Sequence, residues 1–320
     1  MYRTAIRPDI TSVLGELAGT IQEQSVPVEQ YLRQLRAHQM VNPFRHPGAI
    51  RIADAIPEEF LGNKGIRRVI VDEVGVAAED ASGILGRCSL VELADWTELV
   101  DNGAWDKLYS TWIKPLGKRD FQFIFHLGDV AYKPVFGIDE VLDIIGDYSS
   151  RGRVTLMLDG HEADTLWCRL NGRNPGAGDS GATARVSSEW ASFAAARGLT
   201  ARDSGARDVV VRDCTPQDRW LSLFNTMSID FLIVLQAGHA VQFSREGQFN
   251  LNGPPPVGIG GVINGRIRFS AGYQLGLLLR LDPQHCCVLG MAVAGAYGKL
   301  ASGSGAELLV EYLRNWIPIN

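Results

Sequence analysis

Long apolar runs, blocks of basic residues and a secretory leader are all missing from this sequence. No stretch reaches the roughly 18 consecutive apolar residues that a membrane-spanning helix needs, and Met1 to Thr11 lacks a basic start followed by an apolar core. Lysine and arginine total 31 against 36 aspartates and glutamates, a net charge of -5, so there is no strong nucleic-acid signal. We therefore expect a soluble, cytoplasmic protein with no membrane partner.

The cysteines lack the spacing of a disulfide framework or of a zinc site. The sequence has five of them, an odd number, and no C-x-x-C pair. We expect reduced and mostly buried thiols. They are Cys88, Cys168, Cys214, Cys286 and Cys287.

Two motifs of well-known enzyme classes are also missing. The zinc-protease pattern H-E-x-x-H does not occur, and neither does a phosphate-binding loop. The nearest stretch to such a loop, Gly295 to Leu300, is too short between its glycines and has no hydroxyl residue after Lys299. The acidic strand end Val69 to Glu73 resembles the Mg²⁺-binding strand of nucleotide hydrolases, but it has no partner motif.

What is present is enough apolar sequence for a large core. The chain has 320 residues, of which 46% are hydrophobic, so it can form one large domain or two ordinary ones. The spacing of apolar and polar residues changes along the chain. It predicts a helical segment over 1–65, an α/β region over 66–228 and an antiparallel β region with a C-terminal helix over 229–320. In the alternative, one continuous domain extends from 66 to 320.

The clearest pattern lies between residues 120 and 172 and predicts strand, helix, strand and helix in succession. Phenylalanines and a leucine at 121, 123, 125 and 127 alternate with Gln122, Ile124 and His126, which is the period-2 pattern of a strand. Helical spacing follows from Ile138 to Tyr148, then a strand from Val154 to Leu158 and a helix from Gly160 to Leu170. This β-α-β unit would bring polar residues at its strand ends to one edge of a sheet.

Further helices are expected on both sides of this unit. Apolar residues recur at helical spacing within the first 45 residues. Ser89 with Glu92 has the spacing of a capping box, which predicts a helix directly after it, and so does Thr215 with Asp218.

The last third of the chain reads as β-rich. Asn264-Gly265 lies between two β-branched runs and predicts a hairpin, and Glu307 to Trp316 predicts a final helix. Strands this close in sequence must pair antiparallel, because a parallel return needs about a dozen residues. The predicted fold class is therefore α+β (mixed), with a helical N-terminal part, a central β-α-β layer and a largely antiparallel sheet in the C-terminal third. The expected strands cover 231–235, 241–243, 259–263, 266–269, 275–281 and 287–293.

Acidic residues at the ends of the predicted strands suggest a Mg²⁺ site. Asp72, Asp129 and Asp159 each follow a strand, and Mg²⁺ prefers one or two carboxylates together with substrate oxygens. The carboxyl ends of neighbouring strands are where an α/β fold brings such groups together. We therefore predict that these aspartates bind the metal.

Three nearby residues, His126, His161 and Glu162, are the candidate catalytic groups, because an imidazole beside carboxylates can exchange a proton near neutral pH. A structural interpretation competes with this one. Asp159 and Glu162 have the spacing of a capping box, which would occupy both carboxylates, and strand histidines are commonly hydrogen-bonded and half-buried. Capping does not account for Asp129, because no helix is expected directly after it.

These groups favour an intracellular hydrolase or phosphoryl-transfer enzyme that uses a divalent cation and acts on a small or phosphate-containing molecule. The glycine-rich stretch 171–185 would close over the substrate. The alternative is a non-catalytic interaction or self-assembling protein. Its homo-oligomer would form through the β-rich runs of the last third, which carry few charges to protect a strand edge.

Overall fold

The computed structural model describes most of the chain. Several sequence predictions lie outside the described residues: Asp72, Cys88, the glycine-rich stretch beyond Arg173 and the expected strand at 259–263. The described residues are 5–6, 9–40, 50–51, 70–71, 85, 89–93, 96–98, 103–173, 214–253, 265–300 and 305–316.

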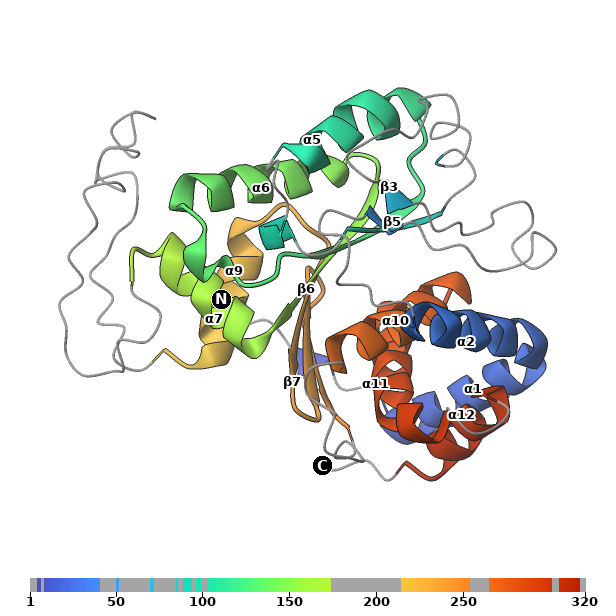
Figure 1. The fold of residues 1–320 in the computed structure, drawn as a ribbon. Helices are drawn as coiled ribbons and strands as arrows, with labels where there is room; N and C mark the ends of the chain where they lie inside the picture. The colour runs from blue at the N-terminus through green and yellow to red at the C-terminus, as the bar shows by residue number, and fades with distance from the viewer. Residues whose placement is uncertain are drawn as a thin grey trace.

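One sheet passes through the described part of the chain and takes strands from every region of the sequence (Figure 1). The strands are β1 (Ala5–Ile6), β2 (Ile50–Arg51), β3 (Ile70–Val71), β4 (Leu90–Leu93), β5 (Phe121–His126), β6 (Gly152–Asp159), β7 (Phe231–Gln236), β8 (His239–Ser244) and β9 (Gln248–Asn252). Their order across the sheet is β1-β9-β8-β7-β6-β5-β4-β2-β3. Strands β4 to β7 are parallel, whereas β7, β8 and β9 form an antiparallel meander.

Helices cover both faces of this sheet (Figure 1). One layer contains α5 (Ala104–Leu108) with its π and 3-10 continuations η3 (Tyr109–Ile113) and η4 (Lys114–Leu116), α6 (Val135–Tyr148), α7 (Gly160–Leu170) and α9 (Pro216–Thr226). The other contains α1 (Ile10–Glu23), α2 (Ser25–Met40), α10 (Gly265–Leu278), α11 (Pro283–Leu300) and α12 (Gly305–Arg314). Two short 3-10 helices, η2 (Trp96–Glu98) and η5 (Val130–Tyr132), follow β4 and β5.

The alternation of side chains along the strands divides the core into two halves. Phe123 and Leu156 pack in the cluster under α6, whereas Ile124 and Met157 pack in the cluster under α10. Residues two apart on a strand point to the same face. His126 therefore lies on the α10 face of the sheet with Ile124, and this placement builds the candidate site.

The predicted β-α-β unit is confirmed. Strands β5 and β6, with α6 between them, occupy the expected ranges and pair in parallel from Phe121 opposite Gly152 to His126 opposite Met157. The helix α7 follows β6 directly and ends at Asn171, with Gly172 in the left-handed conformation (φ 65°).

Helices predicted elsewhere are also confirmed. The first 45 residues contain α1 and α2, and the final helix is α12. The capping box at the start of α9 is complete, because the Thr215 hydroxyl accepts from the Asp218 backbone N–H (3.2 Å) and the Asp218 carboxylate accepts from the Thr215 N–H (3.0 Å).

The strands predicted at 266–269, 275–281 and 287–293 are wrong, because those residues belong to α10, the turn after it and α11. The predicted Asn264-Gly265 hairpin is wrong as well, since α10 begins at Gly265. A helix buried on every side has no solvent-exposed face, so the helical period of its apolar residues is weak. Every residue from Phe269 to Gly276 is buried.

The helix predicted after Ser89 is also wrong, because Leu90–Leu93 is the parallel strand β4. The spacing of Ser89 and Glu92 matches a capping box by coincidence. Glu92 instead lies on a strand opposite Ile124 of β5. Glu92 is therefore a strand residue beside His126 and not a helix cap.

The mixed α and β fold class is confirmed, although the antiparallel part of the sheet in the last third consists of β7, β8 and β9 alone among the described residues. The division at 65 and 228 stays a prediction. Self-association also stays a prediction, but its original basis has changed: the described runs between 266 and 293 lie in or next to the buried helices α10 and α11, not in exposed strand edges.

The described cysteines are free, as predicted. Cys286 and Cys287 are buried, and burial raises the pKa of both thiols, whereas Cys168 and Cys214 are half-buried. Among the described residues, no helix is long and apolar enough to cross a membrane.

Candidate functional site

Polar side chains of three parallel strands lie on the α10 side of the sheet at the carboxyl ends of those strands, which we call the carboxyl edge. Glu92 of β4, His126 of β5 and Asp159 of β6 share the strand parity of Leu90, Ile124 and Met157, which pack under the α10 layer. The carboxyl edge of parallel strands is where ligands bind in open α/β sheets.

A hydrogen-bonded network joins this edge to α10. The Ser270 hydroxyl donates to Glu92 Oε1 (2.8 Å), and His126 Nε2 lies 3.0 Å from the same oxygen. The Gln274 side-chain amide donates to Ser270 Oγ (3.0 Å) from one turn further along α10. One carboxylate oxygen therefore connects β4, β5 and α10.

His126 is only 4% exposed, and its two ring nitrogens have different surroundings. Because Nε2 faces a carboxylate oxygen, we assign the proton to Nε2, which leaves Nδ1 with a lone pair. This buried Nδ1 has no hydrogen-bond partner in the described structure. An unmet buried acceptor costs about 1–3 kcal/mol, so a ligand or a water molecule that donates to Nδ1 would be stabilising.

The network is not the triad of a serine hydrolase. In that triad the carboxylate and the serine contact opposite ring nitrogens. Here Ser270 Oγ lies 3.4 Å from Nε2, the nitrogen that Glu92 already occupies.

A second polar group lies at the start of α7. Asp159 accepts from the Glu162 N–H (2.7 Å) and Glu162 accepts from the Asp159 N–H (2.9 Å), which confirms the capping box. Glu162 is buried and also accepts a hydrogen bond from the Arg266 guanidinium of α10. This ion pair connects α7 to α10.

The remaining two predicted site residues are exposed. His161 lies in the first turn of α7 and makes no contact with the network of Glu92. Asp129 follows Gly128, whose left-handed backbone (φ 79°) turns the chain away from β5. Contrary to expectation a helix does start directly after Asp129, since its carboxylate accepts from the Ala131 N–H (2.9 Å) and caps η5.

Whether a Mg²⁺ ion fits here depends on which carboxylate oxygens are not used in capping hydrogen bonds. No group of three or more histidines, cysteines, aspartates or glutamates in the described part of the chain is arranged to bind a metal. Asp129 and Asp159 each use one oxygen, Oδ1, for capping. Mg²⁺ needs only one or two carboxylates when substrate phosphates complete its shell, so the second oxygens suit it.

The structure brings together residues that the sequence did not point to. Glu92 was assigned to a helix cap, and Arg266, Ser270 and Gln274 were placed in or near strands. Their common signal is polarity inside an otherwise apolar stretch: Arg266, Ser270 and Gln274 recur every four residues, which puts them on one side of a helix. That spacing could have identified both the helix and its polar face.

No protein-family model and no curated protein sequence matches this chain. Similar folds occur among solved structures. The ribokinase of Arabidopsis thaliana, solved with ribose and ATP, aligns with 11% identity and a TM-score of 0.44 over 75% of this chain. The ribokinase of Thermotoga maritima aligns with 14% identity and a TM-score of 0.42 over 78%.

A probable sugar kinase from Rhizobium etli aligns with 12% identity and a TM-score of 0.43 over 72% of this chain. The chain covers 60%, 65% and 55% of these three proteins respectively, less than two thirds of each. At this identity and TM-score the likeness carries no evidence on activity.

Proposed function

We propose that this protein is an enzyme that transfers a phosphoryl group to or from a small molecule, or to water, at the carboxyl edge of its sheet. The observation that carries the proposal is the pair of Glu92 and His126. The carboxylate fixes the imidazole through Nε2 (3.0 Å), and Nδ1 keeps a lone pair that no other described residue uses. This is the arrangement of a general base with its orienting group.

In this proposal substrate binding opens the carboxyl edge, and the His126 Nδ1 that is buried in this structure accepts the proton of the hydroxyl group or water that attacks phosphorus. The bond from phosphorus to the donor oxygen breaks, and that oxygen leaves with the bonding electron pair. Glu92 then stabilises the imidazolium that forms, because its oxygen faces the other ring nitrogen. Proton transfer by a positioned base typically contributes about 10²- to 10⁴-fold to the rate. Ser270 and Gln274 of α10 are positioning residues. Ser270 donates to the Glu92 carboxylate, and Gln274 donates to Ser270.

The phosphate would bind at the start of α10. Arg266 lies in its first turn, and a guanidinium has five N–H donors, so it can bind phosphate oxygens while still bonded to Glu162. The backbone N–H groups of a helix N-terminus also favour an anion. Glu162 acts here as a positioning residue for Arg266 and not as the base.

Asp129 and Asp159 would hold a Mg²⁺ ion through their uncommitted oxygens. When bound, the ion would neutralise charge that develops on the phosphoryl oxygens. Both aspartates precede a helical turn, so they are fixed in place by their capping bonds before any ion arrives.

The test is phosphorus NMR of the protein with Mg²⁺ and ATP, in the presence and absence of small polyols, and with small phosphate esters. The proposal expects a new product signal that disappears when EDTA removes the metal. Unchanged donor signals under every one of these conditions would overturn it.

Replacing Asp159 with asparagine separates the capping role from the metal role. Asparagine caps a helix about as well as aspartate, so the midpoint of thermal unfolding should change little. We expect the activity to fall at least roughly tenfold at low Mg²⁺ and to recover partly as Mg²⁺ is raised, because a ligand charge is lost. The matched control is D9N, which makes the same change at the cap of α1, where Asp9 accepts from the Thr11 N–H. A D159N enzyme with the Mg²⁺ dependence of the wild type would show that Asp159 is only a cap.

The interaction or assembly alternative has one observation in its favour. Tyr132 is 92% exposed and Phe136 63% exposed, and both follow the end of β5. Large aromatic side chains this exposed are frequent at protein interfaces. If they mediate self-association, light scattering should give a mass above 35.0 kDa that rises with protein concentration, and Y132S/F136S should restore the monomer. A constant monomer mass in the wild type would remove this alternative.

A further inference from the structure

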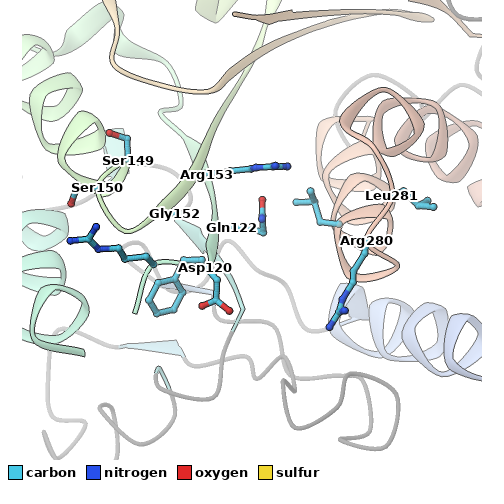
Figure 2. A pocket seen from close by; sticks show the side chains of 11 residues that line it. Asp120, Gln122, Ser149, Ser150, Gly152, Arg153, Arg280 and Leu281 are labelled. Carbon is cyan, nitrogen blue, oxygen red and sulfur yellow. The ribbon is translucent and has the colours of Figure 1, made fainter. Parts of the chain in front are cut away.

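A cavity lies at the amino ends of the parallel strands, opposite the carboxyl edge. Its volume is about 560 Å³, within the range of small-molecule sites. It is lined by the amino ends of β5 and β6, by the turn between α6 and β6, and by the C-terminal end of α10 (Figure 2). We call it the amino-edge pocket.

The amino-edge pocket has an excess of positive charge. Arg119, Arg153 and Arg280 line it together with one acidic residue, Asp120, whose carboxylate already lies 3.7 Å from Lys118 Nζ. In the described part of the chain none of the three arginines has a carboxylate within ion-pair distance. Three positive charges against one negative leave +2. The C-termini of α6 and α10 together offset only about one of these charges.

Arg280 occupies a backbone position that favours glycine. Its φ is 57°, in the left-handed region. It is the second residue after α10, at the C′ position of a Schellman motif: the Arg280 N–H donates to Leu277 O (3.1 Å) and the Leu281 N–H to Gly276 O (3.0 Å). A basic side chain in the last turn of α10 could interact with the helix C-terminus equally well, and its backbone would not need the left-handed conformation. The Arg280 side chain therefore has a role other than stabilising the C-terminal end of α10.

Neutral donors accompany the arginines. Figure 2 shows Arg153 and Gln122 extending from the sheet edge toward α10, with Arg280 at the end of that helix. The Gln122 amide is not engaged by any described residue and can donate to a ligand. Guanidinium groups match the oxygens of a phosphate in paired hydrogen bonds better than they match a monovalent halide or a hydroxyl.

From these observations we propose that the amino-edge pocket binds a phosphate-bearing small molecule, at a site separate from the candidate active site. The proposal does not depend on the proposed function, because it uses none of the residues at the carboxyl edge. It identifies the ligand by its phosphate group, which could be that of an ester or a free phosphate ion.

The experiment is isothermal titration at low salt with inorganic phosphate, a sugar phosphate and citrate in turn. We expect the sugar phosphate or inorganic phosphate to bind, more weakly as salt is added, and the stronger of the two identifies the source of the phosphate. R153Q and R280G should each weaken that binding by roughly tenfold to a hundredfold, because a charge-assisted pair is lost. R245Q, which removes an exposed arginine between β8 and β9, is the matched control and should bind like the wild type.

Two further measurements test the proposal: the thermal unfolding of R280G and the phosphate binding of R266Q. R280G should unfold at the same temperature as the wild type or at a higher one, since glycine relieves the left-handed backbone. R266Q should leave this binding unchanged, because Arg266 lies at the carboxyl edge. Wild-type affinity in both R153Q and R280G, a preference for citrate over both phosphates, or binding lost in R266Q alone would overturn the proposal.

Discussion

Replacing Glu92 with glutamine is expected to lower the phosphoryl-transfer rate by about a hundredfold or more. Glutamine has the same shape, so it can still accept from Ser270, but it carries no charge. The imidazolium of His126 would then form without a carboxylate at Nε2, where Glu92 Oε1 now lies at 3.0 Å. The Michaelis constant should change much less than the turnover number, since the base acts in the transition state.

Turnover in the NMR assay, measured beside thermal unfolding, checks this expectation. E140Q is the matched control, because Glu140 is exposed on α6 and its replacement removes the same charge far from the network. H126Q should reduce turnover at least as strongly as E92Q. Equal turnover in E92Q and the wild type would show that the pair only joins α10 to the strand ends.

Replacing Gly272 with alanine is expected to destabilise the protein by about 2 kcal/mol. The added Cβ would lie 2.6 Å from Leu289 O and 2.8 Å from both Gly290 Cα and Val293 Cβ, so α10 and α11 would have to separate. Forcing a methyl group into a packed core costs up to about 3 kcal/mol, and the better helix propensity of alanine returns about 1 kcal/mol. Equilibrium unfolding in urea measures the difference.

Gly15 supplies the control for this substitution. It lies on the exposed side of α1, and nothing comes within 4 Å of the Cβ that alanine would add there. G15A should therefore stabilise the protein by about 0.5–1 kcal/mol through helix propensity alone. If G272A is as stable as the wild type, the close approach of α10 and α11 is not as described.

The elements with a strong local pattern could be predicted from the sequence. The alternation from Phe121 to Leu127 reflects a strand at the core, and the spacing in α6 and α7 reflects helices with one apolar face. The capping box of Asp159 and Glu162 was also visible, since capping depends on neighbours within one turn. Each of these features is set by contacts that lie close together in the chain.

The helices α10 and α11 could not be recognised in the same way. Most of their residues are buried between the sheet and the remaining helices of the layer, so apolar and small residues cover most of their surface, apart from the row of Arg266, Ser270 and Gln274 on α10. Periodicity disappears when both faces of an element are buried, and the run of apolar residues then resembles a strand. Tertiary packing, and not local preference, makes these segments helical.

The residues of the candidate site can be separated in the same way, into those located by local sequence pattern and those brought together by tertiary packing. By itself the sequence determined that acidic residues and histidines follow β5 and β6, because strand ends can be located from local pattern. Only the tertiary structure decided that Glu92 is a strand residue, that His126 faces α10, and that Ser270 and Arg266 reach the same edge. Glu92 and Ser270 are bonded at 2.8 Å although 178 residues separate them, and no local rule constrains a contact across such a distance in the chain.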